Sequence, residues 1–234
     1  ADDGDIVQFG AGTYVLGDDS DFIVVRTPEV RLLGSSEGTT LLGGAVPVVP
    51  GSYVGAPYLF NNSIVQSPPN GIHLTADEQR ISGISFEGFR TAVMVGFVPF
   101  AETGGYVVEG CDFEASMYGV IAHVESTEES VLKNNTFIND TFPYMLSGGR
   151  FRASGNYVAS PDPARVPIDY THHAGTLIAG APGLTFLAEG VALITEHNVF
   201  EHNVVEGGIA DGYQIVSETG GTVRNNLFRN SVFN

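Results

Sequence analysis

Two stretches of the sequence place side chains that exchange protons close together. The run IDYTHH (168–173) holds a carboxylic acid, a phenol and two imidazoles. Groups of these types act as general acids and bases, and they also bind cations. They make Asp169, Tyr170, His172 and His173 the candidate catalytic residues. The alternative is an exposed loop that contains two histidines by chance.

The second stretch, EHNVFEHNVVEG (196–207), has two histidines five residues apart. On a strand such residues point to opposite faces, and on a helix they diverge by roughly 140°. Neither geometry lets both rings bind one metal ion, unlike an i, i+4 pair on a helix. We therefore expect His197 and His202 to be backbone corner residues rather than metal ligands.

Two arginines form a candidate grip for carboxylates. Arg150 and Arg152 flank Phe151, and a strand's period of two places them on one face. Asp211 and Tyr213 begin a strand-like segment after the IDYTHH run, so they are candidates for the same substrate-binding site. The alternatives are ordinary surface charge for the arginines, and a turn followed by a strand for the other pair.

Calcium is the candidate metal, because two acidic segments carry clustered oxygen ligands. These segments are GDDSD (17–21) and TADEQ (75–79), and neither has the spacing of an EF-hand. A solvated turn is the competing interpretation of both. Glycine-rich phosphate loops, nucleophile elbows and zinc-type Cys/His spacings are absent from the sequence.

A repeat supplies the elements that would position these residues. Six hexads align without gaps, each with a Gly/Asn-rich middle and an apolar last residue, at intervals of 27, 24, 21, 42 and 28 residues. Short strand-like units with such corners are typical of a solenoid, because Gly and Asn tolerate the left-handed backbone of tight corners. The hexads are ISGISF (81–86), VEGCDF (108–113), LKNNTF (132–137), ASGNYV (153–158), TEHNVF (195–200) and VRNNLF (223–228).

Stacked turns of a solenoid, called rungs below, lie roughly 4.8 Å apart, so equivalent residues form columns. Asparagines in one column can then hydrogen-bond each other. In the second hexad column Glu109 neighbours Lys133, and Glu196 neighbours Arg224, which favours this register by a few tenths of a kcal/mol per pair. A structural role is therefore expected for Lys133, the only lysine, ahead of a role as catalytic base. The last column predicts one interior file: Phe86, Phe113, Phe137, Val158, Phe200 and Phe228.

The segments GDIVQFGAGTYVL (4–16) and GIHLTADEQRISGISFEGF (71–89) make the class of fold nameable. Over nearly its whole length the chain resembles the right-handed parallel β-helix proteins of the pectin-lyase-like superfamily. The resemblance implies an all-β, single-stranded right-handed parallel β-helix of roughly nine rungs, taking ~25 residues a rung. It implies one domain (1–234), and the 42-residue interval between two of the hexads predicts a loop excursion around 159–190. Three prolines, which interrupt strand pairing, mark this excursion: Pro161, Pro163 and Pro167.

The resemblance implies polysaccharide as the partner and an acidic polysaccharide as the substrate of a lyase, epimerase or hydrolase. Arg150 and Arg152 would bind the sugar carboxylates, and His172 or Tyr170 would act as base or acid. The paired aspartates of polygalacturonases, the R-x-P-x-x-R of pectate lyases and the D-P-H of alginate epimerases are all missing. The other hypothesis is therefore a non-catalytic module for adhesion, sugar binding or assembly.

Composition excludes several classes of partner. The formal net charge of −17, with ten Lys and Arg against 27 Asp and Glu, argues against nucleic acid and against anionic membrane surfaces. No apolar run approaches the ~18 residues that span a bilayer. Cys111 is the only cysteine, so no intramolecular disulfide forms. An acidic surface suits an extracellular or cell-surface location, and it repels polyanions unless basic residues offset it locally.

Neither end of the sequence shows an amphipathic helix that would cap a solenoid. We therefore expect either self-association through the end rungs or continuation into a longer chain. The sequence does not identify the sugar.

Overall fold

The computed structural model contains only strands, turns and loops over the residues that it describes. Nowhere in that part of the chain is there a helix of the length and hydropathy that a membrane span requires. The described residues are 1–16, 22–43, 70–96, 103–116, 118–124, 126–140, 142–159, 161, 176–179, 185–186, 191–192, 195–206, 213–216 and 218–229.

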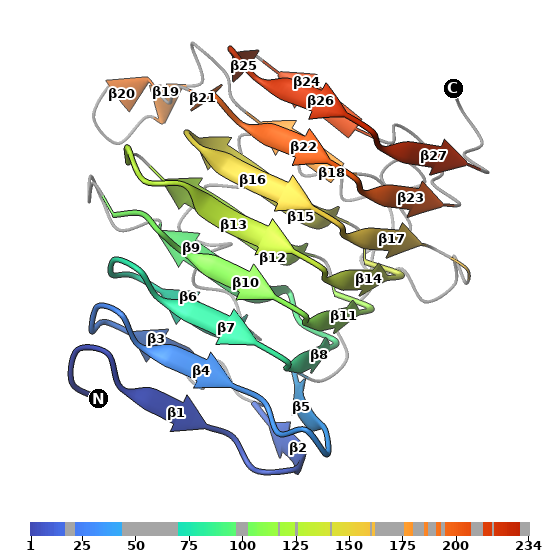
Figure 1. Ribbon diagram of the computed structural model, residues 1–234. Coiled ribbons are helices and arrows are strands. Elements are labelled where there is room, and N and C mark those ends of the chain that lie inside the picture. The colour runs from blue at the N-terminus through green and yellow to red at the C-terminus, as the bar shows by residue number, and fades with distance from the viewer. Residues whose placement is uncertain are drawn as a thin grey trace.

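Three long parallel sheets, A, B and C, organise these residues (Figure 1). Sheet A consists of β1 (Ile6–Gln8), β4 (Arg31–Leu33), β7 (Arg80–Ser82), β10 (Val107–Glu109), β13 (Ser130–Lys133), β16 (Phe151–Ser154), β22 (Val199–Glu201) and β26 (Thr222–Arg224). Sheet B consists of β2 (Gly12–Val15), β5 (Thr39–Leu42), β8 (Ser85–Glu87), β11 (Asp112–Glu114), β14 (Thr136–Ile138), β17 (Tyr157–Ala159), β23 (Val204–Glu206) and β27 (Leu227–Arg229). Sheet C consists of β3 (Ile23–Val25), β6 (Asn70–Leu74), β9 (Thr91–Gly96), β12 (Tyr118–Val124), β15 (Phe142–Gly148), β18 (Thr176–Ala179) and β24 (Tyr213–Val216).

The chain visits the three sheets in turn. It passes from β1 in sheet A to β2 in sheet B and β3 in sheet C, and then returns to sheet A with β4. The neighbours within each long sheet are parallel, for example β10 with β13. This order is compatible with the predicted β-helix solenoid. Sheets A and B each have eight strands in the described part of the chain, against roughly nine predicted rungs.

Alternation along each short strand places one side chain inside. In β11, Phe113 is fully buried while its two neighbours face outward. Its ring stacks on that of Phe86, with centroids 5.1 Å apart, and on that of Phe137, at 4.7 Å. Strand register continues this column through Val158, Val205 and Phe228, as predicted for every member but one. Phe228, on the last described strand, is 43% exposed rather than interior.

The misplaced member is Phe200. It pairs with Ala153 and Val223, so it belongs to the interior column of sheet A rather than that of sheet B. The predicted hexad 195–200 is therefore wrong, and the hexad of this rung is 200–205. The cause is the doubled EHN motif, because both copies precede an apolar pair and only the second lies between sheets A and B. Consequently Glu201, rather than Glu196, is paired with Arg224.

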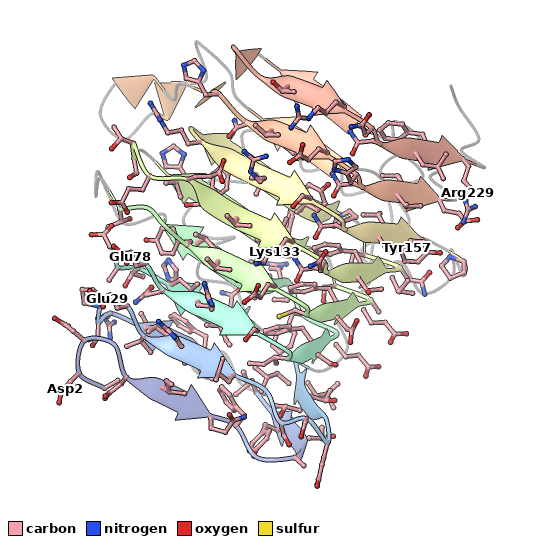
Figure 2. All side chains as sticks on the ribbon, viewed as in Figure 1. Asp2, Glu29, Glu78, Lys133, Tyr157 and Arg229 are labelled. Atoms are coloured by element: carbon pink, nitrogen blue, oxygen red, sulfur yellow. The ribbon has the colours of Figure 1, made fainter. Side chains whose placement is uncertain are left out.

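Left-handed backbone marks the corners between sheets. Before sheet A, Glu29 and Glu78 have φ of 59° and 56° and occupy equivalent corners on neighbouring rungs (Figure 2). His197 has φ of 57° at this same corner, two residues before β22. His202 has the same φ at the next corner, between sheets A and B, where Asn225 follows it one rung later. Both histidines are thus corner residues, as expected, at opposite ends of one strand.

An asparagine ladder runs through the corner between sheets A and B. Asn156 accepts hydrogen bonds at its Oδ1 from the backbone N–H and the side-chain amide of Asn135, at 3.0 and 3.1 Å. Its own amide donates to the Leu132 carbonyl and to Asn203 Oδ1, at 2.9 Å each. Asn203 repeats this arrangement with Asn226. The four side chains are therefore bonded to one another, as predicted for a stack of asparagine corners.

The predicted loop excursion contains strands as well as loop. Within the predicted excursion around 159–190, β18 pairs with β15 and β24, so it belongs to sheet C. Farther along the chain, β19 (Thr185–Phe186) pairs antiparallel with β20 (Val191–Ala192). Then β21 (Thr195–Glu196) pairs in parallel with β25 (Glu218–Thr219). The single-domain assignment over 1–234 stays a prediction.

Candidate functional site

The predicted catalytic run cannot be placed. Asp169, Tyr170, His172 and His173 lie outside the described residues, and so does Asp211. The backbone of Tyr213 opens β24, but its side chain lies outside the described part as well. Acid–base catalysis by these groups therefore stays a prediction.

The arginine pair lies within the described residues and differs from expectation. Arg152 already contacts two carboxylates: its Nε lies 3.0 Å from Glu129 Oε1, and its Nη1 is hydrogen-bonded to Glu201. These carboxylates raise its pKa above the usual value. Arg150 sits at the corner before β16 with φ of 61°, so the two arginines do not share one extended strand. Their role in substrate binding stays a prediction.

Lys133 has a structural partner. Its Nζ lies 2.7 Å from Glu109 Oε2 one rung earlier, and Glu109 also contacts Arg80 at 3.5 Å. Figure 2 shows Lys133 on sheet A near the middle of the stack. The ion pair agrees with the expected structural role and leaves little reason to assign Lys133 as a base.

The described acidic segment forms a turn. In the 75–79 segment, Asp77 Oδ1 accepts the Gly104 N–H at 2.8 Å, and Gln79 Nε2 donates to the carbonyl of Thr27 at 2.7 Å. The other acidic segment, 17–21, lies outside the described residues. Among those described, no three His, Cys, Asp or Glu side chains gather as metal ligands. Calcium binding therefore stays a prediction, with no site for it among the described residues.

Two reactive side chains, the buried Cys111 and the partly buried His73, have structural explanations. Burial raises the pKa of Cys111 to about 12, so its thiol is not a thiolate nucleophile at neutral pH. His73 Nε2 lies 2.7 Å from the Gly96 carbonyl, and burial lowers the pKa of its imidazole. A neutral His73 ring that donates a hydrogen bond to the Gly96 carbonyl explains this arrangement without a catalytic role.

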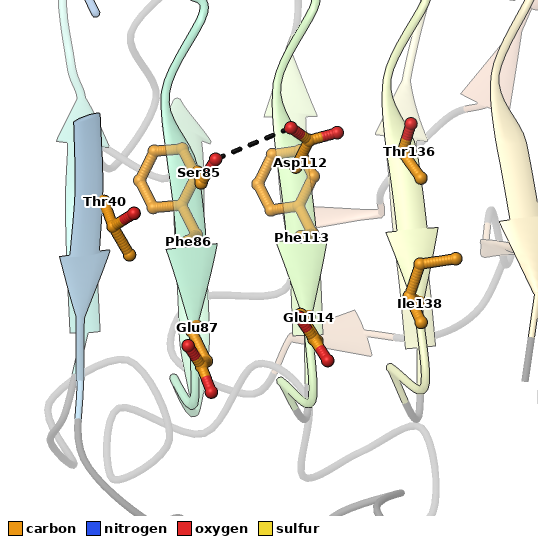
Figure 3. A pocket seen from close by; sticks show the side chains of 9 residues that line it. All are labelled: Thr40, Ser85, Phe86, Glu87, Asp112, Phe113, Glu114, Thr136 and Ile138. Atoms are coloured by element: carbon orange, nitrogen blue, oxygen red, sulfur yellow. Dashed lines mark hydrogen bonds between the residues drawn. The ribbon is translucent and has the colours of Figure 1, made fainter. Parts of the chain in front are cut away.

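The outer face of sheet B carries a groove of about 380 Å³ across β5, β8, β11 and β14 (Figure 3). Phe86 and Phe113 form its floor and point into the core. Hydroxyl and carboxyl groups lie at one end of the strands, and two glutamates and an isoleucine lie at the other. The outward lining residues are Thr40, Ser85, Asp112, Thr136, Glu87, Glu114 and Ile138.

Strand register aligns the groove's polar groups across the sheet. Ser85 pairs with Asp112, and its Oγ donates to the Asp112 carboxylate at 3.5 Å. Asp112 pairs in turn with Thr136, and Thr136 with Tyr157. Tyr157 is 36% exposed, and its hydroxyl donates to Glu206 at 3.1 Å. The row of polar side chains thus crosses the strands and ends at an accessible aromatic ring.

The groove can hydrogen-bond an extended polyol. Carboxylates accept strongly from hydroxyl groups, and Ser and Thr hydroxyls both donate and accept. An exposed tyrosine adds an apolar ring face with a polar tip. The lining of the groove holds three carboxylates and no Lys or Arg, so the groove disfavours a polyanion. The Ser85–Asp112 distance of 3.5 Å exceeds the hydrogen-bond reach of about 2.6 to 3.2 Å typical of an activated nucleophile and its base.

Sequence analysis missed this groove because its residues resemble ordinary solvent-facing strand positions. One signal was available. Glu87 and Glu114 each directly follow one of two consecutive hexads, and like charges directly opposite each other destabilise a sheet. Strand pairing therefore does not explain this pair of glutamates, whereas a binding role for this face of the sheet would.

The sequence matches no protein-family model, no curated protein and no solved structure in the comparisons made with known proteins. The class of protein is therefore defined by the fold alone, as an all-β chain of long parallel sheets.

Proposed function

We propose that the protein is a non-catalytic, polysaccharide-binding module of a secreted or cell-surface protein or assembly. Its fold would be a closed, right-handed parallel β-helix like that of the pectin-lyase-like superfamily. The groove of sheet B would bind a chain of uncharged sugars lying across the strands.

The row from Ser85 through Asp112 and Thr136 to Tyr157 carries the proposal. Consecutive strands present one polar group each at the same height, which suits a ligand that repeats along its length. Polar groups that converge in a concave site provide orientation and specificity, while the tyrosine ring provides contact area.

The negative charge of the groove favours an uncharged polysaccharide over an acidic one. Three carboxylates line the groove, whereas Arg152 on sheet A is engaged by Glu129 and Glu201. A uronate chain would therefore bring further negative charge to a lining that already holds three carboxylates. The enzymatic alternative depends on residues outside the described part of the chain.

Calorimetric titration with two sets of ligands tests the proposal. Uncharged glucan and xylan oligosaccharides should bind, and pectate, alginate and glucuronan should bind more weakly or not at all. Asp112→Asn and Tyr157→Ala should each weaken binding of the uncharged ligand by roughly five- to tenfold. Glu37→Gln, an exposed change at a corner outside the groove, should leave the affinity unchanged.

Three results would overturn the proposal: no binding by any sugar, tighter binding of the acidic chains, or equal affinities for all variants. Release of unsaturated sugars would instead support the lyase hypothesis, and new reducing ends would support the hydrolase hypothesis. An epimerase would give neither product and would invert a sugar carbon. His172→Ala would then be the variant to assay.

A further inference from the structure

One capping device recurs at the corners between sheets. The residue after the left-handed corner points its side-chain oxygen at the backbone N–H of the equivalent residue one rung earlier. Asn135 Oδ1 accepts from Cys111 N at 3.0 Å between sheets A and B. Asn198 Oδ1 accepts from Phe151 N at 2.7 Å between sheets C and A. In each case the asparagine side-chain oxygen accepts from a backbone N–H that has no partner in strand pairing.

Asp140 occupies the same position between sheets B and C. Its Oδ1 accepts the backbone N–H of Ser116 at 2.7 Å, just as the asparagine oxygens do. One rung earlier, Ser116 Oγ accepts the backbone N–H of Phe89 at 3.2 Å. A column of polar caps therefore runs through this corner, and Asp140 is its acidic member.

The second oxygen of Asp140 differs from its asparagine counterparts. The amides of Asn135 and Asn198 donate to main-chain carbonyls of the preceding rung, Val108 at 3.0 Å and Gly148 at 3.2 Å. Asp140 Oδ2 is buried and has no hydrogen-bond partner within the described residues. A carboxylate offers only acceptors at that place, whereas a carboxylic acid offers the donor that the device uses.

The surroundings of Asp140 oppose a negative charge. The residue is 1% exposed, and burial raises its pKa well above the usual value. The hydrogen bond from the Ser116 backbone acts in the other direction. Glu114, on β11, is the charged group that acts on it in the described part of the chain, and its negative charge raises the pKa further.

We propose that the folded protein holds Asp140 protonated, as an asparagine-like cap, and that loss of this proton loosens the corner between sheets B and C. A buried carboxylate without a cation or a full set of donors is strongly unfavourable. The corner is thereby a pH-sensitive element of the stack, in which an alkaline shift weakens the contact between neighbouring rungs.

The direction of the pH dependence follows from the two protonation states. The unfolded chain loses the Asp140 proton near pH ~3.9, and the folded chain keeps it to a higher pH. Between those values the folded state binds more protons, so stability falls as pH rises. Below about pH 4 both states are protonated and the contribution of Asp140 to the slope disappears.

Asp140→Asn tests the proposal, because it keeps the cap and removes the titration. Thermal unfolding from about pH 4 to about pH 8 should show the Tm of Asp140→Asn above that of the native protein by several degrees at the upper end. The two values should converge near pH 4. Asp3→Asn, an exposed change at the first rung, should follow the native profile. Parallel profiles for Asp140→Asn and the native protein would overturn the proposal.

A second measurement keeps the test independent of how the variant folds. The side-chain carboxyl ¹³C shift of Asp140, followed by NMR in the native protein, reports its protonation directly. A protonated shift at about pH 6 is the expected result. An ionised shift at that pH would contradict the proposal even if Asp140→Asn failed to fold.

Discussion

Asn203 Oδ1 accepts two hydrogen bonds from Asn156, one from the backbone N–H and one from the side-chain amide, both at 2.9 Å. The two residues are 47 positions apart in the sequence but directly adjacent in the stack. Both are buried, so water cannot replace either bond. The relationship shows that rung position, rather than distance along the chain, decides which side chains meet.

Asn156→Ala should lower the free energy of unfolding by about 2 to 4 kcal/mol. The change leaves the Asn135 N–H and the Leu132 carbonyl without partners in a buried corner. Chemical denaturation with a linear extrapolation measures the loss. Asn134→Gly, one residue before the ladder and at φ of 55°, is the matched control and should be neutral or stabilising. Equal effects of the two changes would contradict the ladder's role.

The sequence alone predicted much of the fold, because corner chemistry is local and recurs. Asn134-Asn135 and Asn225-Asn226 combine a residue that tolerates left-handed backbone with one that bonds across rungs, so each hexad predicts its own strands. The register failed only at EHNVFEHNVV, where two corners share one motif.

The candidate site was harder to predict than the fold. Asp112 and Thr136 are common residues on an outward strand face, and their alignment exists only once the register is known. The acidic nature of Asp140 was equally uninformative, since the burial that makes it unusual comes from the rungs around it. Sites of this kind depend on neighbours in three dimensions and leave no local motif.

His202→Gly should raise the free energy of unfolding by up to about 1 kcal/mol. The histidine has φ of 57°, a conformation that costs energy for residues with a Cβ. His202→Val should lower stability, because a branched side chain fits left-handed backbone poorly. Thermal unfolding of both variants measures the difference. A histidine needed for ligand binding would instead show loss of sugar affinity in the glycine variant, with little change in stability.

Glu201→Gln should remove an acid-sensitive part of the stability. Arg224 and then Arg152 lower the pKa of Glu201 below its usual value. Its contribution is therefore present above the unfolded pKa of ~4.3 and is lost as pH falls through the lower folded value. Unfolding profiles of the native protein and Glu201→Gln should differ at neutral pH and converge in acid. The contribution of Glu201 to stability grows as pH rises, whereas that of Asp140 falls. A stability difference between the native protein and Glu201→Gln that widened in acid would contradict this prediction.

Phe113→Ala should cost about 3 to 5 kcal/mol, because it opens a cavity between two stacked rings. The ring of Phe113 is fully buried and lies 5.1 Å from that of Phe86 and 4.7 Å from that of Phe137, measured between centroids. Phe228→Ala is the matched control, since Phe228 continues the same interior column but is 43% exposed. Its loss should be less than half as large, because a site open to solvent leaves no closed cavity. Denaturant unfolding of the two variants compares them, and equal losses would mean that interior stacking does not hold the column together.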